Sequence, residues 1–198
     1  MYLRKVILRW FCHFDADQYV NVKILYETLL QYDSSKDYYI GRSSIEKEIE
    51  IEEESDKEVC LNNNIFYQAL VFQKRLKFWF ATGGAGFCLS YHLTEKIQSF
   101  IENGNFMKES EKMGMPDDVT IGYILQKNAN VTLTKVELFH SHYEPLNLLK
   151  NLSNQISISY SFYKHTSNII NINGFSENED PTQFFSLHNY LYKEKKIL

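Results

Sequence analysis

The sequence contains few cysteines and prolines, and it has no long uninterrupted apolar run. Its 198 residues include 3 cysteines, 3 prolines and 8 glycines. Three cysteines allow at most one internal disulfide, and their spacing fits no zinc ribbon or zinc finger. A membrane helix needs roughly 18 to 20 consecutive apolar residues, whereas Arg4, Lys5 and Arg9 interrupt the first apolar stretch. As written, the sequence therefore predicts no disulfide-rich scaffold, no membrane anchor and no export signal.

A strong excess of charge of one sign is also missing. Lysine and arginine together number 21, against 25 aspartates and glutamates, so the net charge is -4 at pH 7. A weakly negative protein repels phosphate backbones, which argues against nucleic acid as a partner. With 44% hydrophobic residues the chain can bury a sizeable core. Its length fits one domain better than two.

Short apolar runs alternate with stretches of helical periodicity. A buried strand is expected at 6–11, an amphipathic helix at 22–30 and a brief strand at 38–40, the order typical of a layered α/β domain with a parallel or mixed sheet. Further along, the patterns predict a strand at 78–80, a glycine turn at 83–86, a helix over 89–100, a helix opening at Pro116, and strands at 136–142 and 156–162.

The segment from Glu46 to Glu58 is rich in glutamate. Few hydrophobic residues interrupt it, which predicts a solvated loop, part of a variable stretch at about 46–75. A calcium-binding loop is the alternative, but the ligand pattern with its central glycine is absent. The acidic stretch therefore carries no functional assignment.

Asp15-Ala16-Asp17 directly follows the first apolar run. Two short carboxylates at a strand end can hold a divalent cation that is also coordinated by phosphate oxygens. Ligands of open α/β sheets bind at such strand ends. A surface turn that happens to contain two aspartates is the alternative interpretation.

Two other clusters could take part in chemistry. His140 and His142 are two residues apart, so on a strand their imidazoles would share a face and could bind manganese, iron or zinc. Asp117 and Asp118 follow Pro116 in the first turn of a helix, where either could serve as a general base. The alternatives are two histidines satisfied by hydrogen bonds and two carboxylates that only complement the helix dipole.

Taken together and in order, these segments resemble the Fringe family of β-1,3-glycosyltransferases. The segments that carry the resemblance are WFCHFDADQYV (10–20), DYYIGR (37–42), FWFATGGAGFCLS (78–90), MPDDVTIGYI (115–124) and LFHSHYE (138–144). A weaker similarity runs from Gln155 to about Tyr192. The resemblance implies a GT-A type α/β domain, a mixed sheet flanked by helices, of which 1–198 would be the C-terminal part.

The resemblance also implies an activity. Family members transfer N-acetylglucosamine from UDP-GlcNAc to the 3-hydroxyl of O-linked fucose on EGF-like repeats of Notch-type glycoproteins, with inversion and Mn²⁺, inside the Golgi. Asp17 and His142 would hold Mn²⁺, Asp15 and Ala16 would lie at the donor, and Asp118 would be the catalytic base. Any membrane attachment would depend on an anchor outside this sequence.

The resemblance further implies a disulfide between Cys12 and Cys88, which would leave Cys60 free. In three respects the sequence departs from the family. Ala16 replaces the middle acid of the Asp triplet, Asn189 stands where a late disulfide would begin, and the chain opens one strand before the Asp motif.

Three other readings stay open. The first is an inactive remnant or a module that binds a glycan or a partner without turnover. The second is a related β-1,3-glucosyl- or galactosyltransferase. The third is a metal-dependent hydrolase built on the two histidines.

Overall fold

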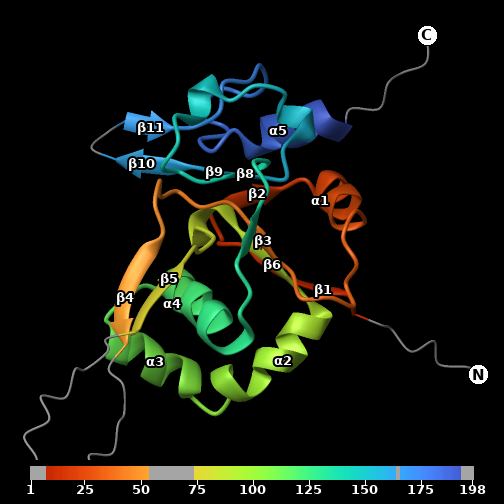
Figure 1. The fold of residues 1–198 in the computed structure, drawn as a ribbon. Helices are drawn as coiled ribbons and strands as arrows, with labels where there is room; N and C mark the ends of the chain where they lie inside the picture. Colours follow the sequence, from red (N-terminus) through yellow and green to blue (C-terminus); the bar gives the residue numbers. More distant parts are fainter. Residues whose placement is uncertain (1–7, 54–73, 164–165, 193–198) are drawn as a thin grey trace, which may run out of the picture.

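The computed structural model describes residues 8–53, 74–163 and 166–192. These residues form a mixed α/β domain with its sheets at the centre (Figure 1). The strands are β1 (Trp10–His13), β2 (Gln18–Val20), β3 (Tyr39–Gly41), β4 (Ile49–Glu53), β5 (Lys74–Phe78), β6 (Phe87–Ser90), β7 (Leu133–Lys135), β8 (Phe139–His140), β9 (Ser157–Ser159), β10 (Ser161–Tyr163) and β11 (Thr166–Asn168). The α-helices are α1 (Val22–Leu29), α2 (Tyr91–Ile101), α3 (Asn105–Met113), α4 (Asp117–Ile124) and α5 (Phe184–Tyr192).

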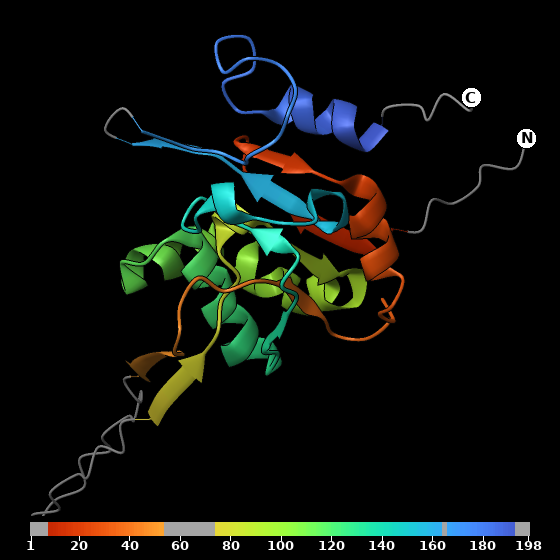
Figure 2. The same cartoon turned by 90° about the horizontal axis from the view of Figure 1, so that it is seen from above.

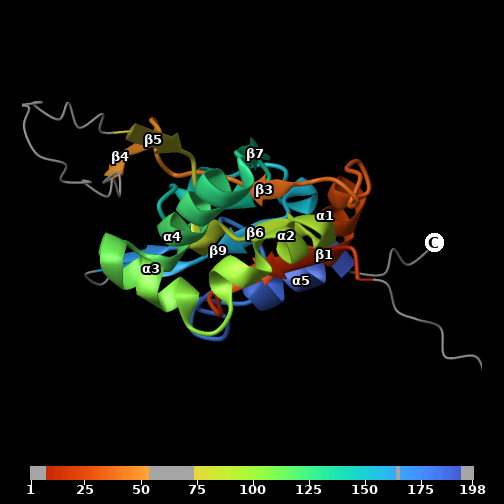
Figure 3. The same ribbon diagram turned by 60° about the horizontal axis from the view of Figure 1, so that its bottom comes forward.

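The largest sheet has the strand order β1-β6-β3-β7. β6 pairs antiparallel with both β1 and β3, whereas β3 pairs parallel with β7. The sheet is therefore mixed, which is one of the two arrangements that the sequence predicted and the one that the resemblance implied. Apolar side chains of α2 and α4 pack on one face around Tyr39, while α1 packs on the other face around Ile40. Figure 3 shows α2 and α4 on their side of these strands.

A second sheet has the order β2-β9-β8 and lies beside the first. The β10–β11 hairpin and α5 lie at the end of the molecule opposite α2 and α3 (Figure 1). Leu187 of α5 is fully buried with Leu146 and Ile158, which joins the C-terminal part to the second sheet. No helix in the described residues has the length and apolar character that a bilayer crossing requires.

The disulfide that the resemblance implied is present. Cys12 of β1 and Cys88 of β6 are bonded to each other and lie directly opposite in the antiparallel register. They are 76 residues apart in the sequence. The expectation that Cys60 is free concerns a residue outside the described ranges.

The prediction of a solvated loop over 46–58 is wrong for part of that segment. β4 pairs antiparallel with β5, and the hairpin projects from the body of the molecule (Figure 2). The alternation of Ile49, Glu50, Ile51 and Glu52 explains the strand, because the isoleucines face the α4 side and pack near Tyr123. The glutamates form ion pairs with Arg75 and Lys77 across the hairpin.

The chain around the glycine turn also differs from the prediction. β5 ends at Phe78, a 3₁₀ turn covers Gly83–Ala85, and Phe87–Ser90 is a strand rather than the start of a helix. Helix α2 begins at Tyr91 because Ser90 caps it, accepting a hydrogen bond from the Leu93 amide. The first strand is β1, and residues 1–7 lie outside the described ranges.

The remaining elements match the sequence in part. Helix α1 confirms the amphipathic helix that was predicted at 22–30, and α4 begins directly after Pro116 as predicted. Helix α3, between Gly104 and Gly114, was not predicted. The strand expected over 156–162 is two strands, β9 and β10, interrupted at Tyr160.

Candidate active site

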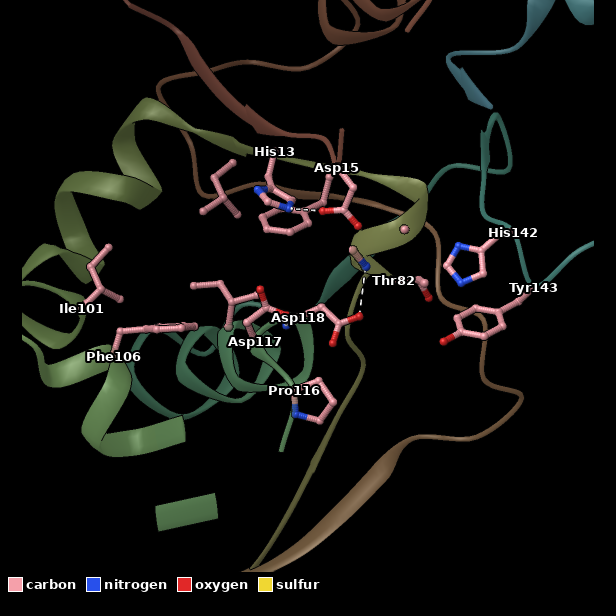
Figure 4. A pocket seen from close by; sticks show the side chains of 15 residues that line it. His13, Asp15, Thr82, Ile101, Phe106, Pro116, Asp117, Asp118, His142 and Tyr143 are labelled. Atoms are coloured by element: carbon pink, nitrogen blue, oxygen red, sulfur yellow. Dashed lines mark hydrogen bonds and ion pairs between the residues drawn. The ribbon is translucent and has the colours of Figure 1, made fainter. Parts of the chain in front are cut away.

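A pocket of about 570 Å³ lies where β1 ends, beside the glycine turn and the N-terminus of α4. Figure 4 shows Asp118 on one side of it, His142 and Tyr143 on the other, and His13 and Asp15 along a third wall. The pocket thus joins segments that are far apart in the sequence. The apolar side chains that line it are those of Phe87, Leu89, Ile101, Phe106 and Ile121.

Asp118 lies in the first turn of α4, and its carboxylate is held by backbone amides. Its Oδ2 accepts a hydrogen bond from the Gly83 amide at 3.0 Å, and its Oδ1 accepts one from the Val119 amide at 2.8 Å. The neighbouring Asp117 accepts from the Asp118 amide at 2.9 Å. Each carboxylate oxygen of Asp118 keeps acceptor capacity beyond these bonds. The side chain is therefore fixed in place while still able to receive a proton.

Buried polar contacts fix the residues that directly precede the glycine turn. The Ala81 amide donates to the hydroxyl of Tyr39 at 2.7 Å, and burial raises the pKa of this tyrosine, so the phenol stays neutral. The Thr82 amide donates to the carbonyl oxygen of Arg42 at 2.9 Å. Gly86 has φ +85°, a conformation that side chains rarely adopt, and a Cβ there would collide with Phe14. The turn can therefore bring backbone to the edge of the pocket.

Asp15 lines the pocket together with a histidine. His13 Nε2 lies 3.0 Å from Asp15 Oδ1. The Asp15 amide donates to Gln18 Oε1 at 2.9 Å, and Gln18 Nε2 donates to the Gly83 carbonyl at 3.2 Å. Gln18 thus connects the Asp motif to the glycine turn.

The other two residues of the Asp motif are placed differently. Ala16 is exposed and, with Asp17, forms the turn between β1 and β2. Neither residue is among the described residues that line the pocket. Asp17 is partly buried, and its Oδ1 has no hydrogen-bond partner among the described residues. The structure thus brings Asp15, Asp118 and His142 together at the pocket, with Asp17 beyond its lining.

The expectation that His140 and His142 share one face of a strand is wrong. β8 ends at His140, and the chain then turns through His142 and Tyr143. The His142 imidazole lies against Gly84, where an added Cβ would be 3.0 Å from its Cε1. His142 Nδ1 is buried and has no hydrogen-bond partner among the described residues. Only the second histidine of the motif therefore faces the pocket.

His140 instead belongs to a buried polar network. Its side chain is 7% exposed, with Nδ1 at 3.0 Å from Glu144 Oε2 and Nε2 at 2.9 Å from Gln155 Oε1. Arg42 Nη1 donates to the same Glu144 oxygen at 2.8 Å. The alternative interpretation of this histidine, that it is satisfied by hydrogen bonds, is the correct one.

Glu144 is kept ionised by its partners. Burial alone would raise the pKa of Glu144. The hydrogen bonds from His140 and from the Ser141 amide act against burial. With the attraction of Arg42 they lower the pKa of this carboxyl below its ordinary value of 4.5.

The residues present fit a divalent cation in two respects. Asp17 offers a carboxylate oxygen and His142 an imidazole nitrogen, and each has a buried atom without a hydrogen-bond partner in the described part of the chain. A mixed oxygen and nitrogen set suits manganese. No cluster of three or more His, Cys, Asp or Glu side chains occurs among the described residues. A cation here would therefore take further ligands from a substrate.

Three residues of the site were missed in the sequence. His13 stands two positions before Asp15, a spacing that places both on one side of an extended chain. Tyr143 directly follows the second histidine, and its ring lies 4.4 Å from that of His142. Asn168 contacts the same turn from 26 residues away, and no local signal in the sequence could have found it.

Comparison with known proteins agrees with the resemblance of the five segments. A family model described as Fringe-like matches residues 2–195. The chain is 42% identical over 186 residues to the Fringe glycosyltransferase of Drosophila melanogaster, covering 93% of this chain and 42% of that protein. It is 42% identical over 189 residues to β-1,3-N-acetylglucosaminyltransferase lunatic fringe of Danio rerio, covering 94% and 47%.

The lunatic fringe enzyme of Homo sapiens is 37% identical over 190 residues, which cover 94% of this chain and 46% of that protein. The chain therefore spans about half the length of the curated relatives that it matches. The matched residues include the Asp motif, the glycine turn, the start of α4 and the His142 turn, which together form the pocket. The chain belongs to the Fringe-like family.

Proposed function

We propose that this chain is part of a β-1,3-N-acetylglucosaminyltransferase. It would transfer N-acetylglucosamine from UDP-GlcNAc to O-linked fucose on EGF-like repeats, with inversion, with Mn²⁺ and on the luminal side of the Golgi membrane. The observation that carries the proposal is the convergence of Asp118, Asp15 and His142 on one pocket. The names of the relatives, N-acetylglucosaminyltransferases among them, support the choice of reaction.

Asp118 would act as the general base. The acceptor hydroxyl would attack the anomeric carbon of the donor while its proton passes to a carboxylate oxygen of Asp118. The bond between the anomeric carbon and the UDP oxygen would break on the opposite side, which inverts the configuration. Backbone amides of Gly83 and Val119 hold the carboxylate in place, so little reorganisation is needed as the proton moves.

Asp17 and His142 would hold the divalent cation. Bound there, the cation supplies positive charge that offsets the negative charge developing on the departing UDP. Asp15 would lie beside the donor, as the resemblance implies. Its carboxylate is oriented by His13 and its backbone amide by Gln18. The apolar side chains that line the pocket would exclude water from the reacting atoms.

A donor panel tests the proposal. The assay uses the full-length protein of which this chain is a part. It is incubated with an O-fucosylated EGF-like repeat and Mn²⁺, and with UDP-GlcNAc, UDP-glucose or UDP-galactose in separate reactions. We expect transfer from UDP-GlcNAc alone, lost when the metal is chelated. Preference for another donor would favour the related glucosyl- or galactosyltransferases. No transfer from any of them would contradict the proposal and favour a module that binds without turnover.

A further inference from the structure

The turn that carries His142 has no regular secondary structure to hold it. β8 ends at His140, and the next regular element is the short 3₁₀ turn Leu146–Leu148. The imidazole of His142 has no hydrogen bond from Nδ1 within the described residues. Gly84 and the Tyr143 ring pack against this imidazole, so its orientation depends on these contacts together with whatever fixes the backbone of the turn.

Asn168, the last residue of β11, fixes that backbone through all of its polar atoms. Its Nδ2 donates to the carbonyl oxygens of His142 and Glu144, both at 2.8 Å. Its Oδ1 accepts from the Leu146 amide at 3.1 Å. One amide side chain thus joins three backbone groups on both sides of Tyr143.

The chemistry of these bonds is specific to an amide. Two donors and an acceptor on one short planar group are found only in asparagine and glutamine. An aspartate of the same shape would accept from Leu146 but would place an oxygen against two carbonyl oxygens. The contact is also long-range, because Asn168 and His142 are 26 residues apart in the sequence. It therefore couples the C-terminal hairpin to the pocket.

We propose that Asn168 is a positioning residue that orients His142 for a divalent cation. This inference rests on the proposed function, because it takes the His142 imidazole as a ligand. Asn168 touches no reacting atom and acts only through the backbone of the turn. Groups that orient metal ligands in this way typically change metal affinity 10- to 100-fold when they are altered.

The test is a titration with Mn²⁺ alone, followed by the electron paramagnetic resonance signal of the free ion. Asn168→Asp is compared with wild type, with His142→Ala as the reference for a lost ligand. Ser167→Ala is the matched control, since within the part of the chain that the structure describes the Ser167 hydroxyl donates to an exposed glutamate, Glu177, and to nothing else. We expect Asn168→Asp to bind Mn²⁺ about 10- to 100-fold more weakly and Ser167→Ala to bind like wild type. Thermal unfolding without metal checks that each variant is folded.

A second readout separates this inference from the proposed function. The imidazole signals of His142 in a carbon–proton NMR spectrum, assigned with His142→Ala, report its orientation without metal. We expect them to shift or broaden in Asn168→Asp and to stay unchanged in Ser167→Ala. Wild-type Mn²⁺ affinity in Asn168→Asp, or unchanged His142 signals, would overturn the positioning role. If wild type binds no Mn²⁺, either alone or with UDP present, but the signals still change, the metal part of the proposed function fails and the positioning role stands.

Discussion

The Glu144 carboxylate accepts hydrogen bonds with both of its oxygens. Oε2 accepts from Arg42 and lies within hydrogen-bond distance of His140, while Oε1 accepts from the Ser141 amide at 3.1 Å. The side chain is 27% exposed, so solvent screens these contacts only in part. At the scale of residues, this one carboxylate joins the residue that follows β3, the end of β8 and the start of the His142 turn.

Glu144→Gln should lower stability in a pH-dependent way. Because its partners depress the pKa of Glu144 in the folded state, the ionised carboxylate stabilises the fold above pH 4.5, its ordinary value. That contribution is lost as the pH falls through the lower folded pKa. Urea unfolding should therefore show the variant less stable at pH 6, with the difference shrinking below pH 4.5.

Glu137→Gln is the matched control. Glu137 also pairs with Arg42, at 3.1 Å, but its side chain is 74% exposed. Exposed ion pairs contribute little, so this variant should unfold like wild type across the same range. A difference between wild type and Glu144→Gln that stays constant with pH would contradict the role given to Glu144.

At the scale of elements, the sequence predicted α1 and the start of α4 but missed α3 and α5. The apolar stripe of α1 is long enough for its period to show, whereas α4 is buried on all sides from Val119 to Ile124 and is marked by Pro116 at its start. The site residue Asp118 was predictable for the same reason. Leu89, by contrast, fits both a helical spacing and a short strand, and its pairing with β1 and β3 decided for the strand.

The two-residue spacing of His140 and His142 also gave a wrong prediction, that of a shared strand face. His140 and His142 would share a face only if the strand continued, but β8 ends at His140. Beyond this end the Ser141 amide donates to Glu144 within the turn, and Asn168, 26 residues from His142, donates to the His142 carbonyl oxygen. The placement of His142 in the pocket therefore came from the resemblance, not from periodicity.

Gly122→Ala should destabilise the protein and disturb the site. Gly122 lies one helical turn after Asp118, and a Cβ there would be 2.6 Å from Phe80 Cβ and 3.0 Å from the Trp79 carbonyl oxygen. Helix α4 would have to move away from this segment, at a cost of about 1–3 kcal/mol. Urea unfolding measures the loss.

Gly83→Ala provides the comparison for that loss. A Cβ at Gly83 would meet Asp118 Cβ at 3.5 Å, which is an ordinary contact. Its effect on the unfolding midpoint should be clearly smaller. Equal stability of Gly122→Ala and wild type would show that α4 does not depend on this close approach.

At the scale of the whole molecule, β1 is an edge strand held by pairing and by one covalent bond. It lies at one end of the sheet order and pairs with β6. Phe11 is 44% exposed, so burial on its side of the sheet is incomplete. The Cys12–Cys88 disulfide therefore has a large share in keeping β1, and the Asp motif that follows it, on the sheet.

Cys12→Ser should lower the free energy of unfolding by about 2–4 kcal/mol, the usual contribution of a disulfide that closes a long loop. Urea unfolding with and without a reducing agent measures it. Reduction should destabilise wild type and leave Cys12→Ser unchanged. Cys60→Ser, which removes the cysteine that the pairing leaves over, should keep the wild-type midpoint. An unchanged midpoint in Cys12→Ser would contradict the role of the disulfide.

The most direct test of the account compares Asp118→Asn with Asp117→Asn in the transfer of N-acetylglucosamine to an O-fucosylated EGF-like repeat. Both aspartates line the pocket from the first turn of α4, but Asp118 accepts a hydrogen bond from the Gly83 amide, whereas Asp117 is exposed and accepts one from the Asp118 amide. Loss of a general base lowers a rate about 10²- to 10⁴-fold. We expect that loss for Asp118→Asn and wild-type rates for Asp117→Asn; equal rates in both variants would contradict the assignment of Asp118 as the general base.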